Sequence, residues 1–201
     1  LTPHSEYVIP RPNVNLHIAP IGMPSYVKPI SHASNRSVDI NIRKWASISN
    51  NISMYNYAIN FRNYLMNFND FGSFQANLVY GLENGLNGWF QQSSLNSYSP
   101  AFTELRLYVQ SQLLWNTSLS HQELARDFIN AYYGKAAEWI WEYYNLTLTN
   151  NVVNVEEKKA PQGTTSGNPA QANFYPFELV NRMATVMERA ELALEPLLTE
   201  N

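Results

Sequence analysis

The sequence contains no cysteine, which excludes a disulfide-stapled scaffold, a thiolate metal site and a cysteine nucleophile. Charged residues make up only 14% of the chain and the net charge is −3, with no run of five basic residues, so we expect no nucleic-acid partner. No stretch of eighteen apolar residues is present, and we expect no membrane span. The first residues lack the basic and apolar segments of a signal peptide, so any such peptide has been removed or lies upstream.

Several sequence motifs of known chemistry are missing as well. There is no G-x-S-x-G, no Walker loop and no dinucleotide fingerprint. The histidines lack the spacing of metal ligands; they are His4, His17, His32 and His121. We therefore expect neither a metal ion nor a cofactor.

The chain is nevertheless typical of a globular domain with a substantial core, since it has 201 residues of which 45% are hydrophobic. Runs of apolar residues, some alternating with polar ones, predict strands over residues 14–19, 52–59 and 86–91. Helical periodicity lies between them, over about 38–49 and 75–84. This order of strand and helix is that of a parallel α/β architecture.

The rest of the chain is predicted to be almost wholly helical. Ser99 with Pro100, and the capping box at Ser120, start two helices. Gly134 is expected to end the second of these helices, and a further helix to cover about 136–148. We expect residues 150–173 to form a mobile loop and a last helix to start near Pro176 within 174–201. Its predicted packing stripe is Val180, Ala184, Met187, Glu191 and Leu194.

These elements predict the C-terminal part of a larger barrel. Three parallel strands cannot close a barrel, which takes about eight. The expected organisation is therefore a partial (β/α)8 barrel of the TIM type with its closing helices over residues 1–149, then the loop and the last helix. The remainder of the barrel, or another copy of the chain, is expected to cover the sheet edges.

Several segments resemble the family catalogued as domain of unknown function 4838, over roughly residues 10–150. The resemblance is carried by residues 13–21, by Met54-Tyr55-Asn56-Tyr57, by residues 84–92, and above all by residues 104–116 and 128–137. Members of this family resemble glycoside hydrolases and occur in bacterial polysaccharide-degrading systems. The resemblance thus implies a glycoside-hydrolase-like barrel, a glycan as ligand, and a secreted, periplasmic or cell-surface location.

The sequence departs from the family pattern at positions that usually carry carboxylates. The second strand usually ends in Trp-Asp-Tyr, where this chain has Tyr55-Asn56-Tyr57. The third strand usually reads Phe-Glu-Gln, where this chain has Phe90-Gln91-Gln92, and Gly22 stands where a glutamate is often found. Because an amide can neither donate a proton at neutral pH nor act as a general base, these changes count against catalysis here.

The candidate ligand contacts lie at or near the C-terminal ends of the strands, where barrels bind their ligands. Amides hydrogen-bond sugar hydroxyls well, and aromatic rings can stack on sugar rings. Packing within the protein or pairing with the backbone is the alternative for each, and it is the better interpretation of His17 and Trp89. The candidates are Asn56, Asn60, Gln91, Gln92 and His17 as hydrogen-bonding groups, and Tyr57, Phe61, Trp89 and Tyr98 as stacking groups.

Two hypotheses of function remain open. Glycoside hydrolysis needs two carboxyl groups, and the strand ends offer none, so a catalytic acid must come mainly from upstream of this chain, or from Asp70. Glu104 and Glu123 lie at helix starts, where they suit the helix dipole. The first hypothesis is a segment of a carbohydrate-active enzyme, and the second is a non-catalytic glycan-binding or structural barrel.

Overall fold

The structure is a computed structural model that describes residues 8–61, 64, 68, 70–93, 102–156 and 175–195. Within these residues the strands are β1 (Leu16–Ile18), β2 (Ile52–Tyr57) and β3 (Leu86–Gln92). The α-helices are α1 (Arg36–Ala46), α2 (Phe71–Glu83), α3 (Thr103–Trp115), α4 (His121–Tyr133), α5 (Ala137–Glu156) and α6 (Phe177–Leu192). Short 3₁₀ turns are η1 (Ala33–Asn35) and η2 (Gly134–Ala136).

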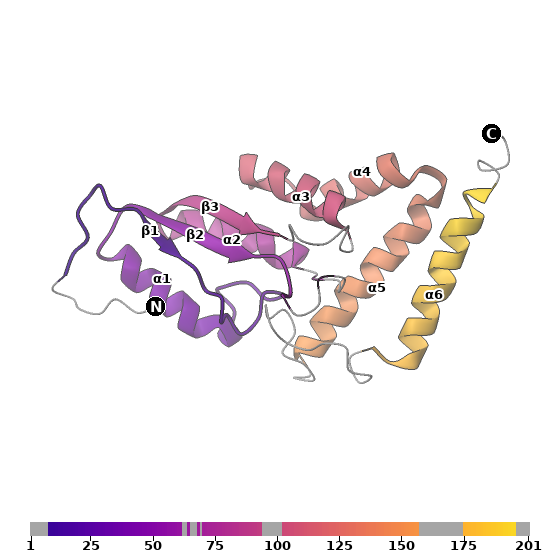
Figure 1. The fold of residues 1–201 in the computed structure, drawn as a ribbon, viewed down its shortest axis with the longest axis horizontal. Coiled ribbons are helices and arrows are strands. Elements are labelled where there is room, and N and C mark those ends of the chain that lie inside the picture. The colour runs from indigo at the N-terminus through magenta and orange to yellow at the C-terminus, as the bar shows by residue number, and fades with distance from the viewer. Residues whose placement is uncertain are drawn as a thin grey trace.

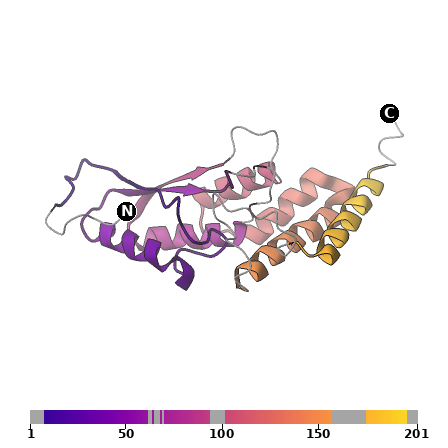
Figure 2. The same cartoon turned by 60° about the horizontal axis from the view of Figure 1, so that its bottom comes forward.

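The strands form one open parallel sheet in the order β1-β2-β3. Ile52 of β2 pairs with Leu16 on one side and with Leu86 on the other. A bulge follows, so that Ser53 lies opposite Gly88. Helices α1 and α2 lie on the same face of the sheet, and α3 to α6 extend away from its end (Figures 1 and 2). The predicted α/β class, with parallel strands followed by a helical segment as in part of a barrel, is confirmed.

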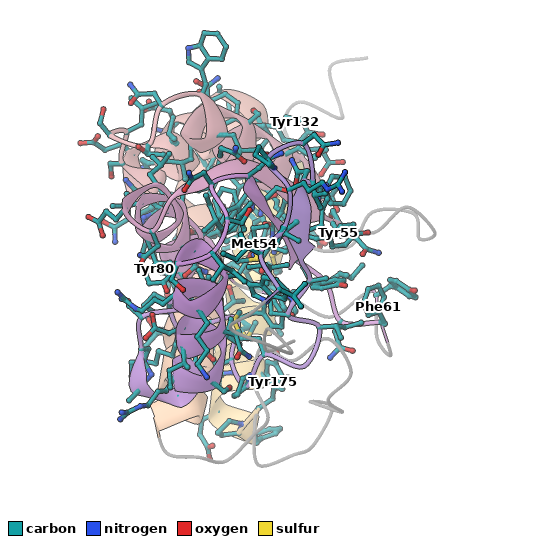
Figure 3. All side chains as sticks on the ribbon, turned by 90° about the vertical axis from the view of Figure 1, so that its left-hand side faces the viewer. Met54, Tyr55, Phe61, Tyr80, Tyr132 and Tyr175 are labelled. Carbon is teal, nitrogen blue, oxygen red and sulfur yellow. The ribbon has the colours of Figure 1, made fainter. Side chains whose placement is uncertain are left out.

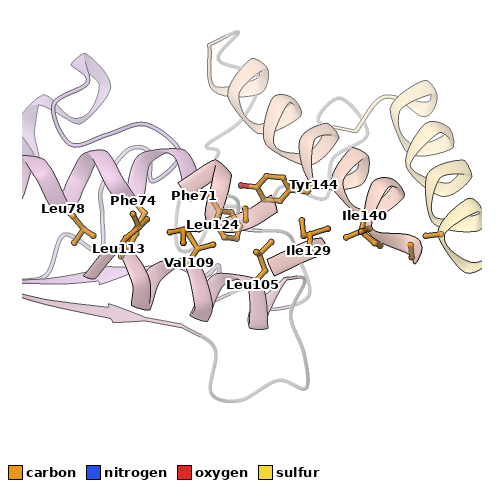
Figure 4. Close-up of a cluster of buried hydrophobic side chains, with 14 residues drawn as sticks. Phe71, Phe74, Leu78, Leu105, Val109, Leu113, Leu124, Ile129, Ile140 and Tyr144 are labelled. Carbon is orange, nitrogen blue, oxygen red and sulfur yellow. The ribbon is translucent and has the colours of Figure 1, made fainter. Parts of the chain in front are cut away.

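Two clusters of buried apolar side chains hold these layers together. The first lies between the sheet and the helices α1 and α2, and includes Ile42, Ile52 and Met54. The second runs from α2 through α3, α4 and α5 to α6 (Figure 4). Trp89 packs against both clusters, which supports its expected role in the core. Burial of each large apolar side chain stabilises the fold by about 1.5–3 kcal/mol.

The turns between the helices follow from residues that the sequence analysis singled out. Ser120 caps α4, because its hydroxyl oxygen accepts a hydrogen bond from the backbone N–H of Glu123 at 3.3 Å. Gly134 ends α4 with φ of 52°, a left-handed value that a residue without Cβ adopts at little cost. Ser99 and Pro100, expected to start α3, lie outside the described residues, and the described part of α3 begins at Thr103.

Several element boundaries differ from those predicted. Strand β1 covers only Leu16–Ile18 of the expected 14–19, and α2 begins at Phe71 rather than near Gln75. Helix α5 continues to Glu156, so the first part of the expected loop 150–173 is helical. No glycine or proline interrupts the chain before Pro161, which lets this helix extend. Residues 157–173 lie outside the described residues.

The predicted packing stripe of α6 was wrong by one residue. Val186 and Ala190 are buried and Leu179 and Met183 are partly buried, whereas Val180 is 47% exposed. The two stripes have the same heptad-like spacing, so periodicity alone does not separate them. The buried stripe contains no charged residue, while the predicted one contains the exposed Glu191. Of the predicted stripe Val180, Ala184, Met187, Glu191 and Leu194, Leu194 is partly buried and the other members are exposed.

Candidate functional site

Side chains of the strands alternate between two faces of the sheet, and this alternation sorts the candidate residues. Ile52, Met54 and Trp89 contact the layer of α1 and α2. Ser53 and Gly88 are register partners on the opposite face. We call that second face the open face, because no described helix covers it. In Figure 3, Tyr55 lies on the side of the sheet away from Tyr80 of α2.

Aromatic rings gather on the open face near the C-terminal ends of β2 and β3. The ring centroids of Tyr55 and Phe90 are 4.6 Å apart, those of Tyr55 and Tyr57 are 5.3 Å apart, and those of Tyr57 and Phe61 are 5.9 Å apart. Phe90 is half exposed, whereas Tyr57 is buried. Burial, followed by the negative charge that Tyr55 would carry, raises the pKa of Tyr57, which therefore keeps its hydroxyl proton at neutral pH. Tyr57 also packs edge-on against Tyr26, so Phe90 supplies the exposed apolar surface of this cluster.

Gln92 adds an amide to this aromatic cluster. It is the register partner of Tyr57, and its Oε1 accepts a hydrogen bond from the Tyr55 hydroxyl at 2.9 Å. Its side-chain NH₂ group has no partner among the residues that the structure describes. Gln92 is only partly buried, so this donor is available to a ligand on the open face.

Asn56 and Gln91 are brought together, but on the face that α2 covers. The Nδ2 of Asn56 donates to Oε1 of Gln91 at 3.1 Å, and the indole N–H of Trp89 donates to the same oxygen at 2.9 Å. Asn56 is buried, and its Oδ1 has no hydrogen-bond partner within the described part of the chain. Side chains alternate between the two faces along a strand, which explains this placement. Asn56 therefore points to the same face as Met54, and Gln91 to the same face as Trp89. Their contact with a sugar stays a prediction, and the burial of Asn56 favours a role in packing.

Asp70, the described carboxylate considered as a catalytic acid, is paired inside the protein. It precedes α2, and its Oδ1 accepts a hydrogen bond from Nη1 of Arg106 on α3. Arg106 also donates to the carbonyl of Phe68 and lies over the ring of Phe71. Burial raises the pKa of Asp70, and the adjacent guanidinium opposes this by favouring the carboxylate. Because both side chains are almost fully buried, they join α3 to the start of α2 and are not exposed to a ligand in solution.

The remaining predicted contacts have different surroundings. His17 is exposed on β1, and its Nδ1 lies 3.0 Å from Oγ of Ser53 on the open face. Asn60 is buried beyond the end of β2. Tyr98 lies outside the described residues. Of the predicted set, the open face thus carries His17, level with Ser53, and Tyr57 paired with Gln92 at the far end of β2 and β3. The buried Asn56 and the partly buried Gln91 form a separate group.

Apolar grooves lie at the two edges of the sheet. A groove of about 550 Å³ lies beside β3, between the end of α2 and the end of α3, and its lining includes Leu82, Leu114 and Trp115. Trp115 is 91% exposed, a large apolar surface for a side chain in water. A second groove, of about 430 Å³, lies beside β1 and includes Ile18 and Ile21. These surfaces are of the kind that a neighbouring strand and helix cover in larger parallel sheets.

No group of three or more metal-ligating side chains is found among the described residues. In the same part of the chain, no helix combines the length and the apolar character that crossing a membrane requires.

Comparison with protein families assigns residues 3–145, most of the chain, to the family described as Domain of unknown function (DUF4838). The chain belongs to this family. Comparison with curated proteins and with solved structures found no significant match. The DUF4838 match includes β1, β2 and β3 and most of the described helices, so the open face and the paired Asp70 and Arg106 are both within the region that defines the family.

Sequence reasoning missed part of this site. Tyr55, Ser53 and Phe90 were not named as contacts, although alternation along the strands gives them the same face as Tyr57 and Gln92. Arg106 was seen only as part of a helix, and nothing in the sequence paired it with Asp70. Its position among apolar residues of α3 was the available signal, since a buried arginine needs a partner.

Proposed function

We propose that this chain recognises a polysaccharide-derived glycan on the open face of its sheet, as part of a carbohydrate-active, glycoside-hydrolase-like barrel. The observation that carries the proposal is the exposed ring of Phe90 beside Tyr55, together with the amide donor of Gln92, which is unpaired among the described residues. An aromatic ring covers the C–H face of a sugar, while an amide binds its hydroxyl groups. These groups lie at the C-terminal ends of parallel strands, where α/β folds bind their ligands.

The placement of the carboxylates favours recognition of a glycan by this segment over hydrolysis of it. Hydrolysis needs a proton donor and a second carboxylate on either side of the glycosidic bond. At the C-terminal ends of β2 and β3 the side chains are amides and aromatic rings with no carboxylate among them, and Asp70 is buried against Arg106. A catalytic acid would therefore have to come from residues outside those described, such as upstream strands of the same barrel. A non-catalytic glycan-binding or structural barrel is the second candidate, and the amides at Asn56 and Gln91 favour it.

The proposal includes a neighbour for each sheet edge and a location. The grooves beside β1 and β3 would be covered by the remainder of the barrel or by another copy of the chain. Because plant and host polysaccharides lie outside the cell that degrades them, the protein would act as a secreted, periplasmic or cell-surface protein.

Binding of neutral and uronic-acid-containing oligosaccharides from plant and host polysaccharides, measured by calorimetry on the full-length protein, tests this function. Phe90→Ala should weaken binding by about 1 kcal/mol, or several-fold, through loss of the stacking surface. Gln92→Ala should have a similar effect through loss of one hydrogen bond. Phe177→Ala is the matched control, because Phe177 is 79% exposed on α6, away from the sheet. Equal affinities in all three variants would refute the proposed site.

A further inference from the structure

A row of asparagine side chains crosses the start of the sheet. Asn15 precedes β1, Asn51 precedes β2, and Asn87 is the extra residue of the bulge in β3. Nδ2 of Asn15 donates to Oδ1 of Asn51 at 3.1 Å, and Nδ2 of Asn87 donates to the same oxygen at 3.2 Å. The row continues to the open face, where Ser53 Oγ donates to Oδ1 of Asn15 at 2.8 Å and meets Nδ1 of His17 at 3.0 Å. We call these hydrogen-bonded side chains, which are Asn15, Asn51, Asn87, Ser53 and His17, the polar row.

A backbone carbonyl at one end of the polar row determines the direction of its hydrogen bonds, that is, which side chain donates and which accepts. Nδ2 of Asn87 lies 3.5 Å from the carbonyl oxygen of Asn50, which can only accept a hydrogen bond. Rotating the Asn87 amide would give up this hydrogen bond and turn its oxygen toward the carbonyl oxygen of Asn50. The atom of Asn51 that faces Asn87 must then be its oxygen, so Asn15 must present its NH₂ group to Asn51 and its oxygen to Ser53.

This direction determines where His17 carries its proton. Ser53 has one hydroxyl proton and donates it in a hydrogen bond to Oδ1 of Asn15 at 2.8 Å, and the carbonyl oxygen of Leu16 at 3.4 Å is likewise only an acceptor. The Ser53 oxygen can then only accept from the imidazole, so Nδ1 of His17 must carry the hydrogen. In the neutral ring, Nε2 is left with an unshared electron pair. His17 is exposed, and Nε2 has no partner among the residues that the structure describes.

We propose that His17 is the hydrogen-bond acceptor of the glycan site, with Nε2 receiving the proton of a sugar hydroxyl. The inference rests on the proposed function and extends it to a subsite next to the aromatic cluster. Gly88, across Ser53 from His17, leaves the sheet surface free of a side chain. Phe90 follows Gly88 on the same face, about 7 Å further along the strand. Two strand spacings of about 4.8 Å each separate His17 from Gly88. An oligosaccharide with one sugar stacked on Phe90 therefore extends over Gly88 and Ser53, and a hydroxyl of its next sugar meets the imidazole.

Long-range proton–nitrogen NMR of the full-length protein at pH 8 tests the proton position without any ligand. We expect Nδ1 of His17 to carry the hydrogen in the native protein, and Ser53→Ala to remove this preference. His121 is the internal control, since its Nδ1 lies 3.2 Å from Oε1 of Gln75 and does not depend on Ser53. A hydrogen on Nε2 of His17 in the native protein would overturn the inference.

Glycan binding then tests the role of the acceptor. His17→Phe should weaken binding of an oligosaccharide from the panel about fivefold, which corresponds to one hydrogen bond. His32→Phe, on the exposed turn before η1, should leave binding unchanged. If Phe90→Ala weakens binding and His17→Phe does not, this inference fails while the proposed function stands. Absence of glycan binding by the native protein would overturn both.

Discussion

The buried pair of Asp70 and Arg106 gives the sharpest prediction about stability. The side chains are 3% and 4% exposed, respectively, so Arg106→Leu leaves a carboxylate buried without its cation. Breaking a buried pair from one side costs about 3–5 kcal/mol. Loss of the hydrogen bond to the Phe68 carbonyl adds to this. The total is a large part of the 5–15 kcal/mol by which domains are usually stable.

The dependence on pH follows from the raised pKa of Asp70. Without Arg106, the pKa of Asp70 in the folded protein rises further, while in the unfolded chain it stays near 4. A group with a raised folded pKa binds more protons in the folded state, so the stability of the variant falls as pH rises above about 4. The cost of Arg106→Leu should therefore be larger at pH 7 than at pH 4.

Urea unfolding at both pH values measures these costs. The double variant Asp70→Asn with Arg106→Leu should recover a large part of the loss, because it removes both buried charges. Arg182→Leu is the matched control, since Arg182 pairs with Glu142 on the surface and is 63% exposed. It should cost less than about 1 kcal/mol. Additive effects in the double variant, or equal costs for Arg106→Leu and Arg182→Leu, would refute the reasoning.

Three further predictions concern packing and backbone conformation. Val186→Asp should destabilise the protein by several kcal/mol, whereas Val180→Asp on the exposed side of α6 should change the unfolding free energy by less than about 0.5 kcal/mol. Gly85 has φ of 78°, so Gly85→Ala should lower stability by about 1 kcal/mol; Gly72→Ala within α2 should raise it, and thermal melting compares the two. Trp115→Ser should leave the melting temperature unchanged but reduce any self-association, measured by sedimentation.

The periodicity of the strands predicted the class of the fold, because buried parallel strands are short apolar runs between helices. Local signals also placed the start of α4 at Ser120 and its end at Gly134, since capping depends on neighbouring residues alone. The packing face of α6 was missed because apolar residues occur on two of its faces. The choice between them depends on contacts with α5, which local sequence does not specify.

The candidate site was predicted in part. Position at the strand ends pointed to the segments that form the aromatic cluster of the open face, but Asn56 and Gln91 were grouped with Gln92 although neighbouring residues of a strand face opposite ways. The bulge at Asn87 shifts the register of β3 and sets which of its side chains reach the open face. The contact between Asp70 and Arg106 spans 36 positions of the sequence, and only the packing of α3 against α2 brings it about.

An NMR titration of the full-length protein with its tightest-binding oligosaccharide tests the central claim most directly. If the open face binds the glycan, the largest shifts of backbone amide signals will occur at Tyr55, Phe90 and Gln92. The amides of α6 should not move, because this helix lies at the far end of the molecule from β1 (Figure 1). Shifts confined to the groove beside Trp115, or to α6, would contradict the assignment of the glycan site to the open face.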